Sequence, residues 1–138
     1  MEQKIEPFTK QLNRYLLNST SYYDLIKEQD YHNLMGGILA PLVRKYVIES
    51  NKESGYGRYD HLLIPRIDKS NNNAFIIEYK VCQSENELEQ STIVGLKQIN
   101  QQHYDTQIKQ YPQVKQITKI ALSFYGKKVM SKYETQSI

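Results

Sequence analysis

The chain has 138 residues, of which 39% are hydrophobic and 24% charged, so we expect a folded globular protein with one domain over residues 1–138. The formal net charge of +3 is compatible with a polyanionic partner but identifies none. The single cysteine, Cys82, excludes an internal disulfide and a cysteine-based zinc site. No apolar run approaches the length of a membrane helix, about 20 residues. No cleaved secretory signal is visible, so we expect an intracellular protein; delivery by a specialised secretion system would leave no readable trace.

Two helices are expected first along the chain. Apolar residues recur at helical spacing from Phe8 to Leu16 and predict a short amphipathic helix. A wider apolar stripe, from residue 31 to residue 46, predicts a second helix with Asp30 as its N-cap. Pro41 lies inside this stripe and would clash with the carbonyl group of Gly37, so we expect a kink there.

The apolar period then changes to that of strands. Residues 46–48 and 58–65 predict two strands, separated by a turn-rich segment. Residues 68–73, which include three consecutive asparagines, predict a loop. Residues 74–81 are apolar on both faces of the alternating pattern, which is typical of a central strand.

The last part of the chain predicts one helix and one strand. Ser84 and Glu87 have the spacing of a capping box, and they predict a helix that ends near Gln110. Residues 119–125 predict a buried strand, closed by Gly126. Helix, helix, three strands, long helix and strand together predict an α/β fold, with helices packed on a sheet.

Three charged residues converge if the strands around the asparagine loop form an antiparallel hairpin. Reflection about residue 70, at the middle of the loop, places Asp60 opposite Lys80. Residues two apart on one strand share a face, so Glu78 would join them. A register slip of one residue would break this arrangement.

Two carboxylates and an ammonium group on an apolar sheet are costly to desolvate, and a divalent cation would explain them. Asp60 and Glu78 offer hard oxygen ligands for Mg²⁺ or Mn²⁺, and Lys80 could orient and activate an attacking water. The alternative is a structural salt bridge at the edge of the hairpin.

Four ordered blocks of the sequence resemble one subfamily of the PD-(D/E)XK nucleases, the domain usually found behind an ATPase-like region in bacterial proteins. The blocks are Ser21-Tyr22-Tyr23-Asp24 with Glu28, Tyr31-His32 and Gly36-Gly37; the segment from Ser50 to Asp60; Glu78-Tyr79-Lys80; and Gln98-Ile99 with Tyr104. The resemblance spans roughly residues 15–125. The motif's proline is replaced by Tyr59, and the ATPase-like partner region is missing, which puts coupling to ATP in doubt.

The resemblance implies a PD-(D/E)XK (restriction-endonuclease-like) core, a mixed central sheet flanked by helices. It implies a metal site made by Asp60, Glu78 and the backbone carbonyl of Tyr79, with the helix of Gln98 beside it. Glu28 and His32 would share a helical face, so Glu28 could reach the metal or its water while His32 contacts a phosphate or orients Glu28. The alternative for His32 is a hydrogen-bonded histidine within the helix packing, and the alternative for Gln98 is packing or solvation on the helix surface.

Three functions remain open from the sequence. The favoured one is a Mg²⁺-dependent nuclease that cuts DNA, with RNA as the other substrate. The second is a catalytically inactive module of the same fold that binds nucleic acid or a protein, and the third is an interaction domain with purely structural charges.

Other signals favour ordinary interpretations. Gly55-Tyr56-Gly57 is typical of a turn, and Cys82 of a small buried residue rather than a nucleophile. His61 and His103 lack zinc-site spacing. Lys127, Lys128 and Lys132 form a basic cluster that we interpret as a solvated tail, with a nucleic-acid contact as the alternative.

Overall fold

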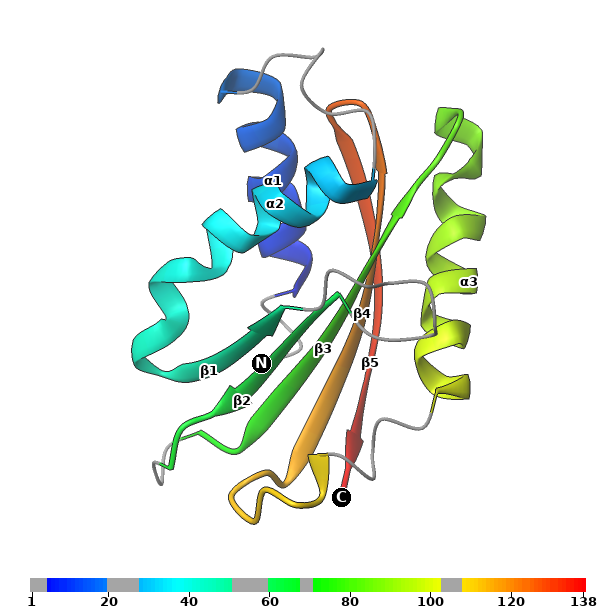
Figure 1. The fold of residues 1–138 in the computed structure, drawn as a ribbon. Helices are drawn as coiled ribbons and strands as arrows, with labels where there is room; N and C mark the ends of the chain where they lie inside the picture. The colour runs from blue at the N-terminus through cyan, green and yellow to red at the C-terminus, as the bar shows by residue number, and fades with distance from the viewer. Residues whose placement is uncertain (1–4, 20–27, 51–59, 68–70, 103–107) are drawn as a thin grey trace.

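A computed structural model describes residues 5–19, 28–50, 60–67, 71–102 and 108–138. Its elements, in chain order, are α1 (Ile5–Ser19), α2 (Glu28–Leu39), the 3₁₀ helix η3 (Ala40–Arg44), β1 (Tyr46–Ser50), β2 (His61–Pro65), β3 (Asn73–Val81), the 3₁₀ helix η5 (Glu85–Glu87), α3 (Leu88–Gln101), β4 (Gln116–Tyr125) and β5 (Lys128–Ser137) (Figure 1).

The strands form a five-stranded sheet in the order β1-β2-β3-β4-β5. All neighbouring pairs are antiparallel except β3 and β4, which run parallel. Parallel strands need a crossover connection, and α3 supplies it. Helices α1 and α2 cover one face of the sheet and α3 covers the other (Figure 1). The expected α/β architecture, a mixed sheet flanked by helices, is confirmed.

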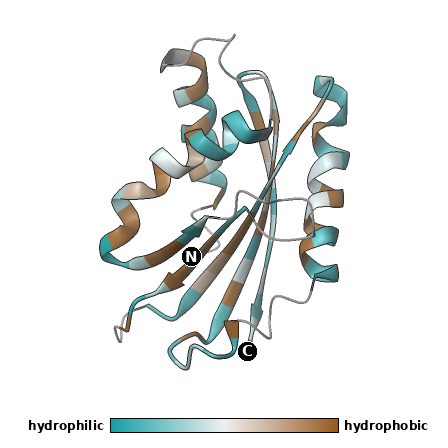
Figure 2. Ribbon diagram, in the orientation of Figure 1, coloured by the Kyte–Doolittle hydropathy of each residue, from teal (hydrophilic) through white to brown (hydrophobic). Residues whose placement is uncertain are grey.

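Alternate side chains of β3 pack into two apolar cores, one on each face of the sheet. Phe75, Ile77 and Tyr79 pack in the core beneath α1 and α2. Ala74 and Ile76 pack in the second core, on the α3 side. The central strands are mostly hydrophobic in Figure 2, as expected for a strand buried on both faces. On the α3 side the apolar run along β3 ends at Glu78.

The second helix differs from the expectation in both of its ends. It begins at Glu28, so Asp30 lies inside α2 and the predicted N-cap is wrong. The α-helix ends at Leu39, and residues 40–44 form η3 with a proline in its first turn. Proline is well tolerated at the start of a helix, because its missing N–H has no intrahelical partner there. Pro41 therefore ends α2 and starts a new turn rather than kinking one long helix.

The helix α3 is shorter than predicted. Ser84 Oγ donates a hydrogen bond to Glu87 Oε1 at 3.0 Å, so the expected pair does interact. Neither side chain caps a backbone N–H, however, and the α-helix begins at Leu88 after η5. It ends at Gln101, whereas we expected an end near Gln110.

The predicted solvated tail is instead the strand β5. Gly126 adopts a φ of 57°, a conformation that glycine reaches without a steric penalty, and it reverses the chain between β4 and β5. Lys128 and Lys132 lie on β5, and Lys127 is in the turn. No helix within the described residues is long and apolar enough to cross a membrane.

Candidate active site

Asp60 and Glu78 lie at the same level of the β2–β3 hairpin. His61 pairs with Ile77 in an antiparallel register, so the residue before His61 falls beside the residue after Ile77. The predicted pairing of Asp60 with Lys80 is therefore wrong by two residues, because the hairpin is symmetric about residue 69 rather than residue 70. Glu78 and Lys80 share one face of β3 and form an ion pair, whereas the Asp60 carboxylate contacts His32 of α2, so the grouping of all three charges stays a prediction.

The Asp60 carboxylate is buried and held from two sides. Asp60 is only 2% exposed to solvent. Oδ2 accepts a hydrogen bond from the backbone N–H of Tyr79 at 2.8 Å, and Oδ1 lies 3.3 Å from His32 Nδ1. The backbone N–H of Asp60 donates to the carbonyl of Ile77 at 3.0 Å. These contacts hold the carboxylate at the end of β2.

Burial raises the pKa of Asp60, and this effect outweighs the Tyr79 N–H, His32 and Lys80, all of which lower it. The charged carboxylate is therefore poorly compensated by the protein alone. A cation beside it would supply the missing compensation.

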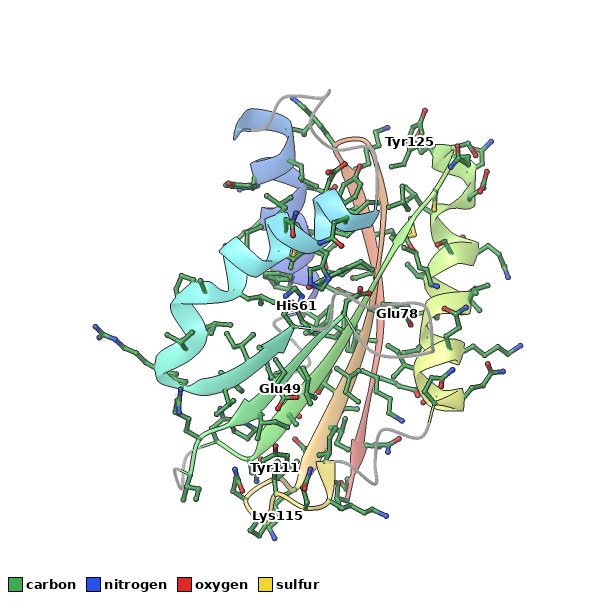
Figure 3. The ribbon with its side chains drawn as sticks, in the orientation of Figure 1. Glu49, His61, Glu78, Tyr111, Lys115 and Tyr125 are labelled. Atoms are coloured by element: carbon green, nitrogen blue, oxygen red, sulfur yellow. The ribbon has the colours of Figure 1, made fainter. Side chains whose placement is uncertain are left out.

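Glu78 and Lys80 form a half-buried ion pair on the α3 side of β3. Lys80 Nζ lies 3.7 Å from Glu78 Oε1, and their side chains are 25% and 15% exposed. Glu78 is seen between the sheet and α3 in Figure 3, while His61 lies on the α2 side. The ion pair at the edge of the hairpin, which was one alternative, is thus present. Its presence does not exclude metal binding, since both carboxylates retain further lone pairs.

Helix α3 packs closely against the sheet beside Lys80. A Cβ atom on Gly95 would lie 3.0 Å from Ala121 Cβ and 3.6 Å from Lys80 Cγ. Only glycine lets the helix backbone pack this closely against β3 and β4. The aliphatic stem of Lys80 is therefore confined between the sheet and the helix.

Gln98 lies on the next turn of α3, and its Oε1 is buried without a hydrogen-bond partner among the described residues. Ser123, the β4 partner of Lys80, has a hydroxyl in the same condition. Buried polar groups are nearly always paired, so such atoms mark places where a water or ligand completes the structure. Sequence reasoning missed Ser123, because its position across from Lys80 depends on the parallel pairing of β3 with β4.

His32 lies between Asp60 and Ser50. Its Nε2 is 2.7 Å from Ser50 Oγ, and its ring stacks on His61 with centroids 4.4 Å apart. An ionised Asp60 can only accept, so His32 Nδ1 carries the proton between them. This is the buried, hydrogen-bonded histidine of our alternative interpretation, and the carboxylate it contacts is that of Asp60. Glu28 is the first residue of α2, but its side chain lies outside the described part of the chain.

A second buried hydrogen bond joins His61 to Tyr79 on the α2 side. His61 Nδ1 lies 2.6 Å from the Tyr79 hydroxyl. Burial, followed by the nearby His32, lowers the pKa of His61 to about 4. Burial and then Asp60 raise the pKa of the Tyr79 hydroxyl. Both groups are neutral near pH 7, so the hydroxyl donates and His61 Nδ1 accepts; nothing in the sequence spacing indicated this pair.

The oxygen donors predicted as ligands are of the hard type that a divalent cation prefers. They are the carboxylates of Asp60 and Glu78 and the carbonyl of Tyr79. The carbonyl points to the Asp60 side of β3, because both main-chain groups of a strand residue face the same neighbour. In the described ranges, no group of three or more His, Cys, Asp or Glu side chains could hold a metal ion. A metal here would complete its coordination with water or phosphate oxygens, and the unpaired Gln98 Oε1 could accept from such a water.

Several predicted elements of the site lie outside the described residues. They are Ser21-Tyr22-Tyr23-Asp24, most of the block from Ser50 to Asp60 including Gly55-Tyr56-Gly57 and Tyr59, and His103 with Tyr104. Cys82 is described and is a buried free thiol, as expected.

Comparison with protein-family models gives a match over most of the chain. Residues 26–134 match the family model of the PD-(D/E)XK nuclease superfamily. The matched range includes Asp60 and the Glu78-Tyr79-Lys80 segment. No curated protein matches the chain.

Proposed function

The chain belongs to the PD-(D/E)XK nuclease superfamily, and we propose that it is a metal-dependent nuclease that hydrolyses phosphodiester bonds, with DNA as its substrate. Its mixed sheet with helices on both faces is consistent with the restriction-endonuclease-like core of that superfamily. The observation that carries the proposal is the buried Asp60 carboxylate, bonded to the Tyr79 N–H at 2.8 Å and level with the Glu78–Lys80 pair.

Asp60, Glu78 and the Tyr79 carbonyl would hold Mg²⁺ or Mn²⁺. When bound, the cation supplies Lewis-acid polarisation of the phosphate and a more acidic water. Lys80 would orient the attacking water and neutralise charge on the phosphoryl group, since its ammonium lies 3.7 Å from a ligand oxygen of Glu78. Gln98 would position that water through its unpaired oxygen. His32 would hold the Asp60 carboxylate in place through its Nδ1.

The test is a cleavage assay on labelled single- and double-stranded DNA and RNA, with Mg²⁺, with Mn²⁺ and with EDTA. We expect metal-dependent cleavage that falls about 10²-fold or more in Lys80→Ala, the loss expected when a transition-state contact is removed. Lys97→Ala is the matched control, because it removes an equal charge from the exposed surface of α3 and should leave the rate unchanged.

Equal cleavage by the parent and by Lys80→Ala would show a contaminant or remove Lys80 from the mechanism. If no substrate is cut under any condition, the inactive binding module becomes the better interpretation. The ATPase-like partner region implied by the resemblance stays a prediction.

A further inference from the structure

A pocket opens beside the candidate active site, on the α2 side of the sheet. It has a volume of about 330 Å³ and lies between α2, η3 and the first two strands. His32 lines it and also contacts the Asp60 carboxylate through Nδ1, at 3.3 Å. The pocket therefore borders the Asp60 end of the candidate site through the His32 ring.

The lining is mostly apolar, with a few polar groups. Gly36, Ala40, Val43 and Ile48 supply the apolar part. Ser50 supplies a hydroxyl that His32 Nε2 holds at 2.7 Å. Apolar walls with a small number of fixed polar atoms are typical of sites for small, flat ligand groups, and the volume is at the low end for such sites.

Charge favours an anionic ligand at this place. Arg44 and Lys45 directly follow Val43 and are exposed. Arg66 is also exposed and is tied to the same turn, since its Nε donates to the carbonyl of Val43 at 2.9 Å. None of the described residues that line the pocket is acidic. An anionic ligand bound at the pocket would thus lie near exposed cations at the end of η3 and directly after β2.

We infer that this pocket binds one unpaired nucleobase of a bound strand, so that the preferred substrate is single-stranded. The inference rests on the proposed nuclease function. A base paired and stacked in a duplex cannot enter a pocket, whereas an unpaired base can leave the stack and lie against apolar walls. The neighbouring phosphates would then lie against Arg44, Lys45 and Arg66.

Two adjacent glycines of α2 provide a matched pair of variants. A Cβ atom on Gly36 would lie 3.8 Å from His61 Nε2, inside the pocket wall, while one on Gly37 would meet nothing within 4 Å. Gly36→Leu should fill the pocket without a backbone clash. Gly37→Leu makes the same chemical change in open space.

The experiment measures binding by fluorescence anisotropy in EDTA, where metal-dependent cleavage cannot occur. The probes are a labelled single-stranded DNA 12-mer, the same strand with abasic sugars, and the duplex. We expect Gly36→Leu to weaken binding of the intact single strand about tenfold, as for loss of one base contact, and Gly37→Leu to change it less than about twofold. The parent should bind the abasic strand as weakly as Gly36→Leu binds the intact one.

Equal affinity of the two variants for the intact strand, or equal affinity of the parent for the intact and abasic strands, would overturn the inference even if the protein cleaves DNA. No binding of any probe would overturn it as well. A nuclease that failed the Lys80→Ala assay but showed the expected binding pattern would lose its proposed activity and keep its base pocket. Melting curves of both variants check that each remains folded.

Discussion

At the scale of single residues, Asp60 is a buried carboxylate whose charged form is disfavoured by burial. It is 2% exposed, and its pKa is raised by burial despite the Tyr79 N–H and His32. Asparagine has nearly the same shape and can still accept the Tyr79 N–H, but it has no charge to bind a cation. The residue is thus a place where charge can be removed with little change in packing.

Asp60→Asn should fold at least as well as the parent in EDTA and should lose stabilisation by Mg²⁺. A ligand at 100 times its dissociation constant stabilises a folded protein by about 2.7 kcal/mol, and the variant should gain almost none of this. The measurement is the melting temperature with and without Mg²⁺. A variant that still gained the full shift would show that Asp60 is not a ligand, and a variant that failed to fold would assign it a structural role.

At the scale of elements, the contact of α3 with the sheet decides where Lys80 can lie. Gly95 faces Ala121 and the stem of Lys80, and added side-chain atoms there have no free space. Ala121 is fully buried on β4, so it cannot move aside without disturbing the sheet. The position of the ammonium therefore depends on a small residue one turn before Gln98.

Gly95→Val should lower the free energy of unfolding by about 1–3 kcal/mol, the usual effect of overpacking. It should also reduce cleavage, because α3 would move away from Lys80. Gly37→Val is the matched control on α2, where the added atoms meet nothing within 4 Å and only a small change in stability is expected. Denaturant unfolding curves measure both. Equal stability of the two variants would contradict close packing at Gly95.

The elements also differ in how well local sequence could predict them. β3 was recognised because apolar side chains occupy both of its faces, and that pattern is independent of its partners. β5 was missed because most of its residues are charged or polar and it has little apolar signal of its own. It becomes a strand through ten residue pairs with β4, which the tight turn at Gly126 aligns. Pro41 was misjudged for a related reason, since a stripe of apolar residues continues across the point where η3 replaces α2.

At the scale of the whole molecule, the net charge of +3 is small, so nucleic-acid binding must depend on where the cations lie. Arg44 and Lys45 directly follow Val43 of the pocket lining, and Arg66 donates hydrogen bonds to the carbonyls of Val43 and Lys45. Binding to phosphates releases counterions, and each phosphate contact on a single strand contributes about 0.7 to the slope of log K against log salt.

Binding of single-stranded DNA should therefore weaken as salt is raised, and Arg44→Ala should reduce the slope by about 0.7. Anisotropy titrations over a series of salt concentrations measure it, with Lys97→Ala on α3 as the control whose slope stays unchanged. Salt-insensitive binding would contradict contacts to the phosphate backbone. An unchanged slope in Arg44→Ala would place the bound strand elsewhere.

The sequence by itself determined that a carboxylate and an ammonium group lie on the same face of β3. Glu78 and Lys80 lie two apart on a strand, so they share a face whatever surrounds them, and they form an ion pair there. Only the tertiary structure decided which groups meet them. The register that puts Asp60 beside Glu78, the contact of His32 with Asp60, and the approach of α3 through Gly95 all join distant segments. Local periodicity records the face on which a side chain lies, whereas loop geometry and long-range packing determine its partner.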